Sequence, residues 1–159
     1  MTTFHLTGLP DDFTREVRAT LRSPEYGHPA LREIAKGTGP CRACLDLFEV
    51  GAEERLLFTY RPPADGEGLG APGPVFIHAE QCARFAGTGF PAGLRTLPLF
   101  LEARASGGRV VATARATGNG IEASIERLFD DVAVEHLYLR HGEAGCHIAR
   151  VDRGPARER

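Results

Sequence analysis

Several features that would assign a protein to a broad class are missing from this sequence of 159 residues. No apolar run approaches the roughly 20 residues that a membrane-spanning helix needs. The formal net charge is only -2, which leaves no basic field for nucleic acid. Neither a Walker A phosphate loop nor a dinucleotide-binding fingerprint is present. We therefore expect no membrane or nucleic-acid partner, and a small molecule or a protein remains as the partner.

The start of the chain also lacks the charged and apolar regions of a secretory leader. We therefore expect a cytoplasmic protein, in which cysteines stay reduced. That setting favours metal, catalytic or core roles for the four cysteines over structural disulfides. Lysine is almost absent, with Lys36 alone among the 19 basic residues. We attribute the excess of arginine to codon bias and not to phosphate binding.

The cysteines themselves are the most informative feature that is present. Cys41 and Cys44 form a C-x-x-C pair, and His78 and Cys82 follow four residues apart. Three thiolates and one imidazole are a ligand set typical of tetrahedral zinc. The spacing predicts that Cys41, Cys44, His78 and Cys82 bind one zinc ion. If residues 79–82 are helical, His78 and Cys82 share a face.

Cys146 and His147 offer a variation on this set. Either residue could replace one of the four ligands. Neighbouring residues of a strand point to opposite faces, so the two are not expected to ligate together.

Other interpretations of the same residues remain open. Cys41 and Cys44 could form a thiol redox couple. A cysteine beside His78 or His147 could act as a nucleophile. The cysteines could also be plain core residues, since free cysteine is often buried. A small-molecule-modifying enzyme is the alternative to a zinc-binding domain, and its site would lie between the Gly/Pro-rich loop 62–74 and the Cys/His cluster.

Two arginines are candidate ligand-binding residues. Arg42 lies between the first two cysteines, and Arg150 lies near the end of the chain. A guanidinium group can bind an anionic ligand through two parallel hydrogen bonds. We predict that Arg42 and Arg150 contact such a ligand.

Hydrophobic periodicity predicts two main helices and a series of short strands. Helices are expected over 11–21 and 120–129, and a helical turn over 81–85. Asn119 and Glu122 have the spacing of a capping box at the start of the second helix. Expected strands cover 4–9, 31–35, 55–60, 75–78, 97–103, 109–115, 132–140 and 146–151. The segment 106–108 has the composition of a hairpin turn.

This order predicts an α+β fold, with a mixed, mainly antiparallel sheet and two main helices packed against it. The length is that of one domain, so we expect a single globular domain over residues 1–152. The polar segment 153–159 is expected to be a frayed tail. The loop 62–74 is expected to be mobile, because its composition offers little apolar surface to bury.

The motifs together resemble an uncharacterised bacterial family known only as a domain of unknown function. The resemblance rests on Pro-Cys-Arg-x-Cys-Leu over 40–45, Gly-Pro-Val-Phe-x-His-Ala over 73–79 and Gly-Cys-x-x-x-Arg over 145–150. The acidic end of the predicted second helix, over 128–131, also fits. The resemblance covers most of the chain beyond the first thirty residues. It implies a shared fold and carries no activity, substrate or catalytic residue.

Overall fold

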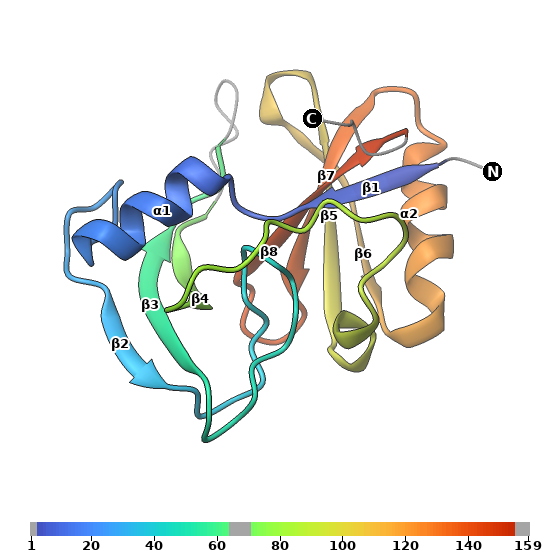
Figure 1. Ribbon diagram of the computed structural model, residues 1–159. Helices are drawn as coiled ribbons and strands as arrows, with labels where there is room; N and C mark the ends of the chain where they lie inside the picture. Colours follow the sequence, from blue (N-terminus) through green and yellow to red (C-terminus); the bar gives the residue numbers. More distant parts are fainter. Residues whose placement is uncertain (1–2, 64–70, 155–159) are drawn as a thin grey trace.

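The computed structural model describes residues 3–63 and 71–154 (Figure 1). These residues form two helices, α1 (Asp11–Thr20) and α2 (Ile121–Phe129). The strands are β1 (Phe4–Thr7), β2 (Leu31–Ile34), β3 (Glu54–Tyr60), β4 (Gly73–His78), β5 (Leu99–Ala105), β6 (Val110–Ala116), β7 (Val134–His141) and β8 (His147–Arg153). Short 3₁₀ turns cover Ala92–Thr96, Ser106–Gly108 and Gly118–Gly120. The predicted α+β class is confirmed.

The strands form two antiparallel sheets and not one mixed sheet. One sheet has the order β1-β8-β7-β5-β6, and the other has the order β2-β3-β4. The first strand of the chain pairs with the last, with Leu6 opposite Val151. Figure 1 shows the sheets side by side, with α1 beside the smaller sheet and α2 beside the larger one. Sequence periodicity shows which residues are in strands but not which strands pair.

Each sheet has its own hydrophobic cluster. We call them the five-strand core and the three-strand core. The five-strand core combines residues of β1, β5, β7 and β8 with Ile121, Ile125, Leu128 and Phe129 of α2. These four residues are the stripe that the helical period predicts.

The three-strand core combines Leu56 and Phe58 of β3 and Val75 and Ile77 of β4 with Val17 of α1. The packing of both helices on a sheet stays a prediction. It is supported because α2 contributes residues to the five-strand core and α1 contributes Val17 to the three-strand core.

Two local predictions were wrong. Residues 81–85 form no helical turn. Asn119 does not cap α2, whose N-cap is Gly120 without a side-chain hydrogen bond. Residues 118–120 instead form a 3₁₀ turn, and Glu122 pairs with Arg95. The Glu122 carboxylate, which would bond to the N-cap backbone nitrogen in a capping box, binds the Arg95 guanidinium instead.

The two predicted loose segments fall partly outside the described residues. Of the loop 62–74, residues 64–70 are not described, and β4 already begins at Gly73. Of the tail 153–159, residues 155–159 are not described. Arg153 still belongs to β8 and donates to the carbonyl oxygen of Phe129 at 2.7 Å. β8 therefore extends two residues past the strand end predicted at 151.

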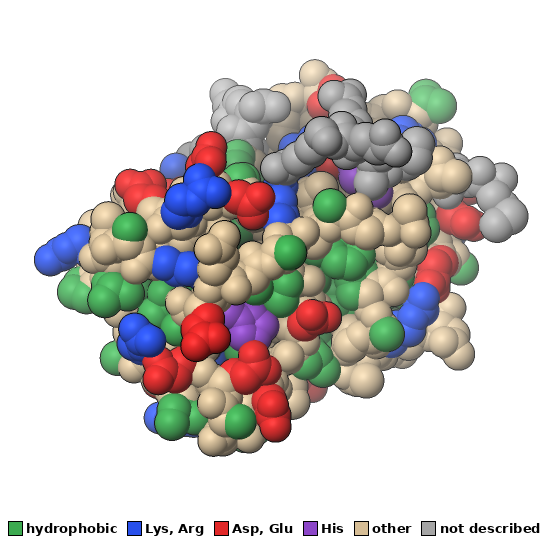
Figure 2. All heavy atoms as spheres, in the orientation of Figure 1, with side chains coloured by type: hydrophobic (Ala, Val, Ile, Leu, Met, Phe, Trp, Pro, Cys, Tyr) green, Lys and Arg blue, Asp and Glu red, His purple; other side chains and the backbone are tan. Residues whose placement is uncertain are grey.

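The surface is mixed in charge. On the face drawn in Figure 2, acidic and basic side chains alternate, and a histidine lies among several acidic groups. The small net charge agrees with this picture. Within the described part of the chain, neither helix has the length and apolar character that a bilayer crossing requires.

Candidate metal centre

The first two cysteines lie on a tight turn between the two cores. The turn is closed by a hydrogen bond from the Leu45 nitrogen to the Cys41 oxygen at 2.9 Å. Gly39 enters it with a φ of 100°, and a Cβ there would lie 2.4 Å from the Phe48 ring. Leu45 leaves it with a φ of 62°. Cys41 belongs to the three-strand core and Leu45 to the five-strand core. The turn therefore joins the two halves of the molecule.

Backbone contacts place this turn beside the end of β4. Cys41 forms a parallel bridge with Phe76, and the Arg42 nitrogen donates to the Phe76 oxygen at 2.9 Å. His78 lies two residues farther along β4, and its backbone nitrogen donates to the Cys41 sulfur at 3.3 Å. The position of His78 next to the cysteines therefore follows from strand geometry.

The chain after β4 brings the third cysteine back to the turn. The Ala79 nitrogen donates to the Glu54 oxygen at 3.0 Å, which fixes where the chain leaves the sheet. Cys82 follows, and the Phe85 nitrogen then donates to the Ala43 oxygen at 2.9 Å. Cys82 is thus held from both sides without a helix. His78 and Cys82 meet the pair because the segment curves over it, not because they share a helical face.

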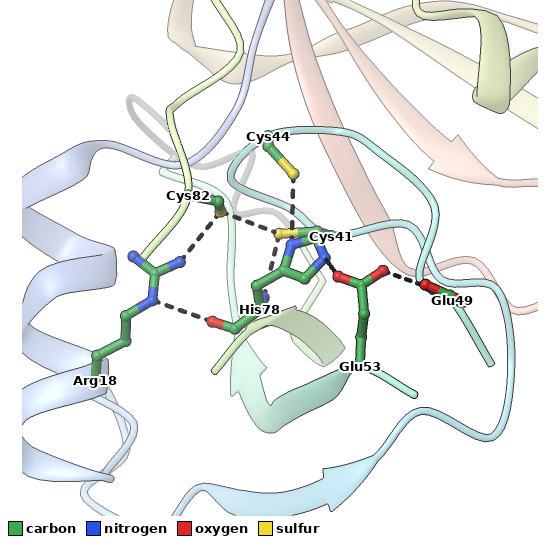
Figure 3. A network of polar contacts seen from close by, with 7 residues as sticks. All are labelled: Arg18, Cys41, Cys44, Glu49, Glu53, His78 and Cys82. Carbon is green, nitrogen blue, oxygen red and sulfur yellow. Dashed lines mark hydrogen bonds and ion pairs between the residues drawn. The ribbon is translucent and has the colours of Figure 1, made fainter. Parts of the chain in front are cut away.

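The four predicted metal ligands converge (Figure 3). One donor atom from each of Cys41, Cys44, His78 and Cys82 lies within 4.8 Å of the other three. Tetrahedral zinc, with bonds of about 2.3 Å to sulfur and about 2.0 Å to nitrogen, separates two sulfurs by about 3.8 Å and sulfur from nitrogen by about 3.5 Å. The sulfurs of Cys41 and Cys82 are 3.8 Å apart, and the Cys44 sulfur is 3.5 Å from His78 Nδ1. The group can therefore hold a metal ion.

Two further side chains surround the cluster. Glu53 lies 2.6 Å from His78 Nε2, so Nδ1 is the ring nitrogen that faces the sulfurs. A carboxylate on the second nitrogen of a ligating histidine fixes the ring and raises its basicity. The guanidinium of Arg18 donates to the Cys82 sulfur at 3.3 Å and to the His78 oxygen at 3.1 Å. Arg18 therefore supplies positive charge beside the Cys82 sulfur.

The protonation of the cluster is shared among its members. Hydrogen bonds from Cys44, and then from Cys82, lower the pKa of the Cys41 thiol well below its usual range. The resulting Cys41 thiolate is the main reason why the pKa values of Cys44, Cys82 and His78 are raised. Without a metal, the Cys41 thiolate therefore lies beside two thiols that hold their protons and beside a histidine whose pKa is raised. A divalent cation would displace those protons, because metal ligands must be deprotonated.

An open hollow of about 870 Å³ gives access to the cluster. Cys44, His78 and Cys82 lie on its wall together with the acidic residues Asp46, Glu53 and Glu80. Negative charge around an entrance raises the local concentration of cations. The hollow therefore suits the arrival of a metal ion from solvent.

The remaining candidates do not contribute a donor atom to the converging group. Cys146 is half-buried in the turn before β8, and its sulfur contacts the Ala144 oxygen at 3.9 Å. Arg42 is buried and donates to the backbone oxygens of His147 at 2.7 Å and Pro40 at 2.6 Å. Arg150 is exposed and pairs with Asp152 at 3.0 Å. Ligand binding by Arg42 and Arg150 stays a prediction, and the two have different surroundings.

Sequence reasoning missed Glu53 and Arg18. Neither residue belongs to the Cys/His motifs on which the metal prediction rests. The pairing of Arg55 with His78 across β3 and β4 is what brings Glu53 near the imidazole. Once that pairing is known, an acidic residue two positions before Arg55 becomes a candidate. No local pattern identifies Arg18, because its contacts lie 60 and 64 residues away.

A comparison with protein families gives one match. Residues 38–153 match a family described as "Protein of unknown function (DUF1203)". Neither the curated proteins nor the solved structures include a match to this chain. All four residues of the Cys/His cluster lie within the matched range, whereas Arg18 lies before it.

Proposed function

The chain belongs to the DUF1203 family, which carries no assigned activity, and we propose that it is a zinc-binding domain built on Cys41, Cys44, His78 and Cys82. The observation that carries the proposal is that the four donors lie within 4.8 Å of one another, with two of their separations equal to those of a tetrahedral site. Sulfur–sulfur and sulfur–nitrogen separations of 3.8 Å and 3.5 Å leave room for one ion at ordinary bond lengths.

The choice of zinc follows from the donor set. Three thiolates and an imidazole are soft to borderline ligands, which disfavour magnesium and calcium. Four protein ligands complete a tetrahedral shell, and closed shells of this kind are structural rather than catalytic. Zinc with three thiolates carries one net negative charge, and the guanidinium of Arg18 lies beside one of those thiolates. A reducing cytoplasm would keep the thiols available for the metal.

A structural role also suits the place of the cluster in the fold. Its members come from the turn at 41–44, the end of β4 and the segment after β4. One ion bound to all of them would cross-link three separate segments around the three-strand core. The metal would then fix the surface on which a small-molecule or protein partner binds.

Metal analysis of the purified protein, paired with a thiol count, tests the proposal. We expect one zinc per chain, with Cys44→Ser losing the metal and Cys146→Ser keeping it. Cobalt reconstitution should give the visible bands of a tetrahedral thiolate site. Wild-type protein that binds neither zinc nor cobalt would rule out the proposal, as would equal metal loss in both variants.

A thiol redox role is the second candidate, and one contact favours it. Cys41 and Cys82, with their sulfurs 3.8 Å apart, are close enough to approach a disulfide after a small movement. Mass spectrometry of the metal-free protein after mild oxidation would detect that bond. A reversible disulfide in metal-free protein that never binds zinc would favour the redox role. A fully reduced, zinc-loaded protein would favour the structural site.

A further inference from the structure

A second, smaller cavity lies at the junction of the two sheets, away from the Cys/His cluster. Its volume is about 120 Å³. The wall is formed by the chain between β1 and α1, by side chains of β3, β7 and β8, and by two arginines. The residues on which its chemistry depends are Tyr60, Pro63, Arg84, Tyr138, His147 and Arg150. Cavities for drug-sized ligands measure about 300–1,000 Å³, so this one suits a smaller molecule.

His147 is the most unusual group on this wall. Its side chain is 6% exposed, and its Nδ1 has no hydrogen-bond partner among the described residues. The ring lies between Tyr60 and Tyr138, with centroid distances of 5.4 Å to each. Burial, and then the charges of Arg42 and Arg140, lower the pKa of His147 to about 3. The ring is therefore neutral and adds no charge to the wall of the cavity.

The other polar groups on the wall are mainly donors. Arg84 and Arg150 line the cavity, and none of its lining residues in the described part of the chain is acidic. Arg84 uses its Nε on the Gly8 oxygen at 2.9 Å, while Arg150 uses Nε and Nη2 on Asp152. Each guanidinium keeps at least one terminal nitrogen that donates to no described residue. The donors therefore outnumber the acceptors in a pocket with positive charge.

Tyr60 adds a neutral hydroxyl to this set. Burial, and then the charges of Glu25 and Tyr138, raise the pKa of Tyr60 above its usual range, so the phenol keeps its proton. Its hydroxyl makes no hydrogen bond with the rest of the described chain. The rings of Tyr60 and Tyr138, with Leu9, Pro10 and Pro63, supply apolar surface. The wall thus combines cationic donors with a small apolar compartment.

We propose that this cavity binds a short-chain organic monocarboxylate. Its carboxylate would face the guanidinium groups of Arg84 and Arg150, and its apolar body would lie against Tyr60 and Tyr138. The neutral imidazole of His147 would complete the polar contacts. Charge selects an anion, apolar surface selects an organic anion over inorganic phosphate, and volume selects a short chain. The proposal does not depend on the metal centre.

Binding of sodium butyrate to the purified full-length chain tests the inference. At constant ionic strength, we expect saturable changes in the amide resonances of Tyr60, Tyr138 and His147. The neutral analogue butyramide should bind at least about tenfold more weakly, because a charge-assisted hydrogen bond is replaced by a neutral one. Inorganic phosphate should not compete with butyrate.

Three variants locate the site. Arg150→Gln and Tyr60→Phe should each weaken butyrate binding, the first by about tenfold or more. Arg109→Gln removes an exposed arginine that does not line the cavity, and this variant should bind butyrate as the wild type does. Metal content should be the same in all three. Equal affinity for butyrate and butyramide, tighter binding of phosphate, or unchanged binding in Arg150→Gln would each overturn the assignment.

Discussion

The five-strand core and the three-strand core differ in what can hold them together. In the larger half, buried apolar residues come from four strands and from one face of α2. In the smaller half, β2 exposes most of its side chains, with Leu31 56% and Ile34 52% exposed. That half instead contains Cys41 and packs Cys44 and Cys82 against its edge. The smaller half contains fewer buried apolar residues than the larger one, so a metal cross-link has most to contribute here.

Metal removal should give the largest difference in stability between the two halves. With zinc bound, β3 and β4 should exchange their amide protons slowly, as β5 and β7 do. Chelation should remove protection in β3 and β4 and leave β5 and β7 protected. Binding of structural zinc to small peptides is worth about 10–16 kcal/mol, so its loss is the largest effect expected. Hydrogen exchange with mass spectrometry measures both halves at once, and equal loss in both would contradict the expected division.

The half that contains the five-strand core should be destabilised by removing a buried side chain and not by removing the metal. Leu128 is buried in the five-strand core, and Leu128→Ala should lower the free energy of unfolding by about 2–5 kcal/mol. Leu31→Ala in exposed β2 is the matched control and should change it by under about 0.5 kcal/mol. Urea denaturation of the metal-loaded variants measures both values. A cost below that of the control would show that α2 does not pack its apolar stripe on the sheet.

Acid should destabilise the junction between the halves through His147. The pKa of this residue is about 3 in the fold, against 6.5 for an ordinary histidine. At pH values between these two pKa values, His147 is protonated in the unfolded chain but neutral in the folded chain. Stability should therefore fall as pH decreases through this window, by up to about 1.4 kcal/mol per pH unit.

His147→Phe isolates that contribution. Acid also protonates metal ligands, so the informative quantity is the difference in slope between the variant and the wild type. Denaturation at several pH values should give a shallower acid dependence for His147→Phe. Identical slopes would show that the buried imidazole does not govern this loss of stability.

The smallest effect concerns the carboxylate behind His78. Glu53→Gln should lower metal affinity by about 10–100-fold, since the ring loses the anion that orients it. Glu54→Gln is a close control, because Glu54 pairs with Arg32 on the surface. Competition with a chromophoric chelator gives both affinities. Equal metal affinities for the two variants would show that Glu53 does not support the metal site.

The larger half was the easier one to predict. The hairpin of β5 and β6 and the stripe of α2 follow from patterns within about ten residues, where periodicity is informative. The sequence also placed short strands close to β2, β3 and β4. It did not reveal that they form a separate sheet, because the pairing of strands is decided by contacts between distant residues. The predicted capping box failed for the same reason, since Arg95 binds Glu122 from 27 residues away.

The four residues of the Cys/His cluster were predicted from their residue types, but the path of the chain that brings them together was not. The chain has only four cysteines, and thiolates and imidazoles are the ligands that zinc prefers. Residue type and spacing were therefore sufficient to select Cys41, Cys44, His78 and Cys82. The expected helix between His78 and Cys82 is absent, and the segment curves back through Phe85 instead. Glu53 and Arg18 were not foreseen, because their roles depend on pairing and packing. The cysteines and the histidine were identified because their side chains are themselves typical metal ligands. Glu53 and Arg18 were not, because only the fold brings them to the cluster.

The turn at 41–44 has a consequence for how the molecule folds. Its backbone bonds to Leu9, Phe76 and Phe85, and the Arg42 side chain reaches His147 across 105 positions of the chain. Contacts so distant in sequence form slowly, after local hairpins. During synthesis, β8 emerges about 105 residues after Arg42, so the turn would gain this partner late. We expect zinc capture in refolding to lag behind the far-UV circular dichroism signal, and simultaneous kinetics would contradict this late assembly.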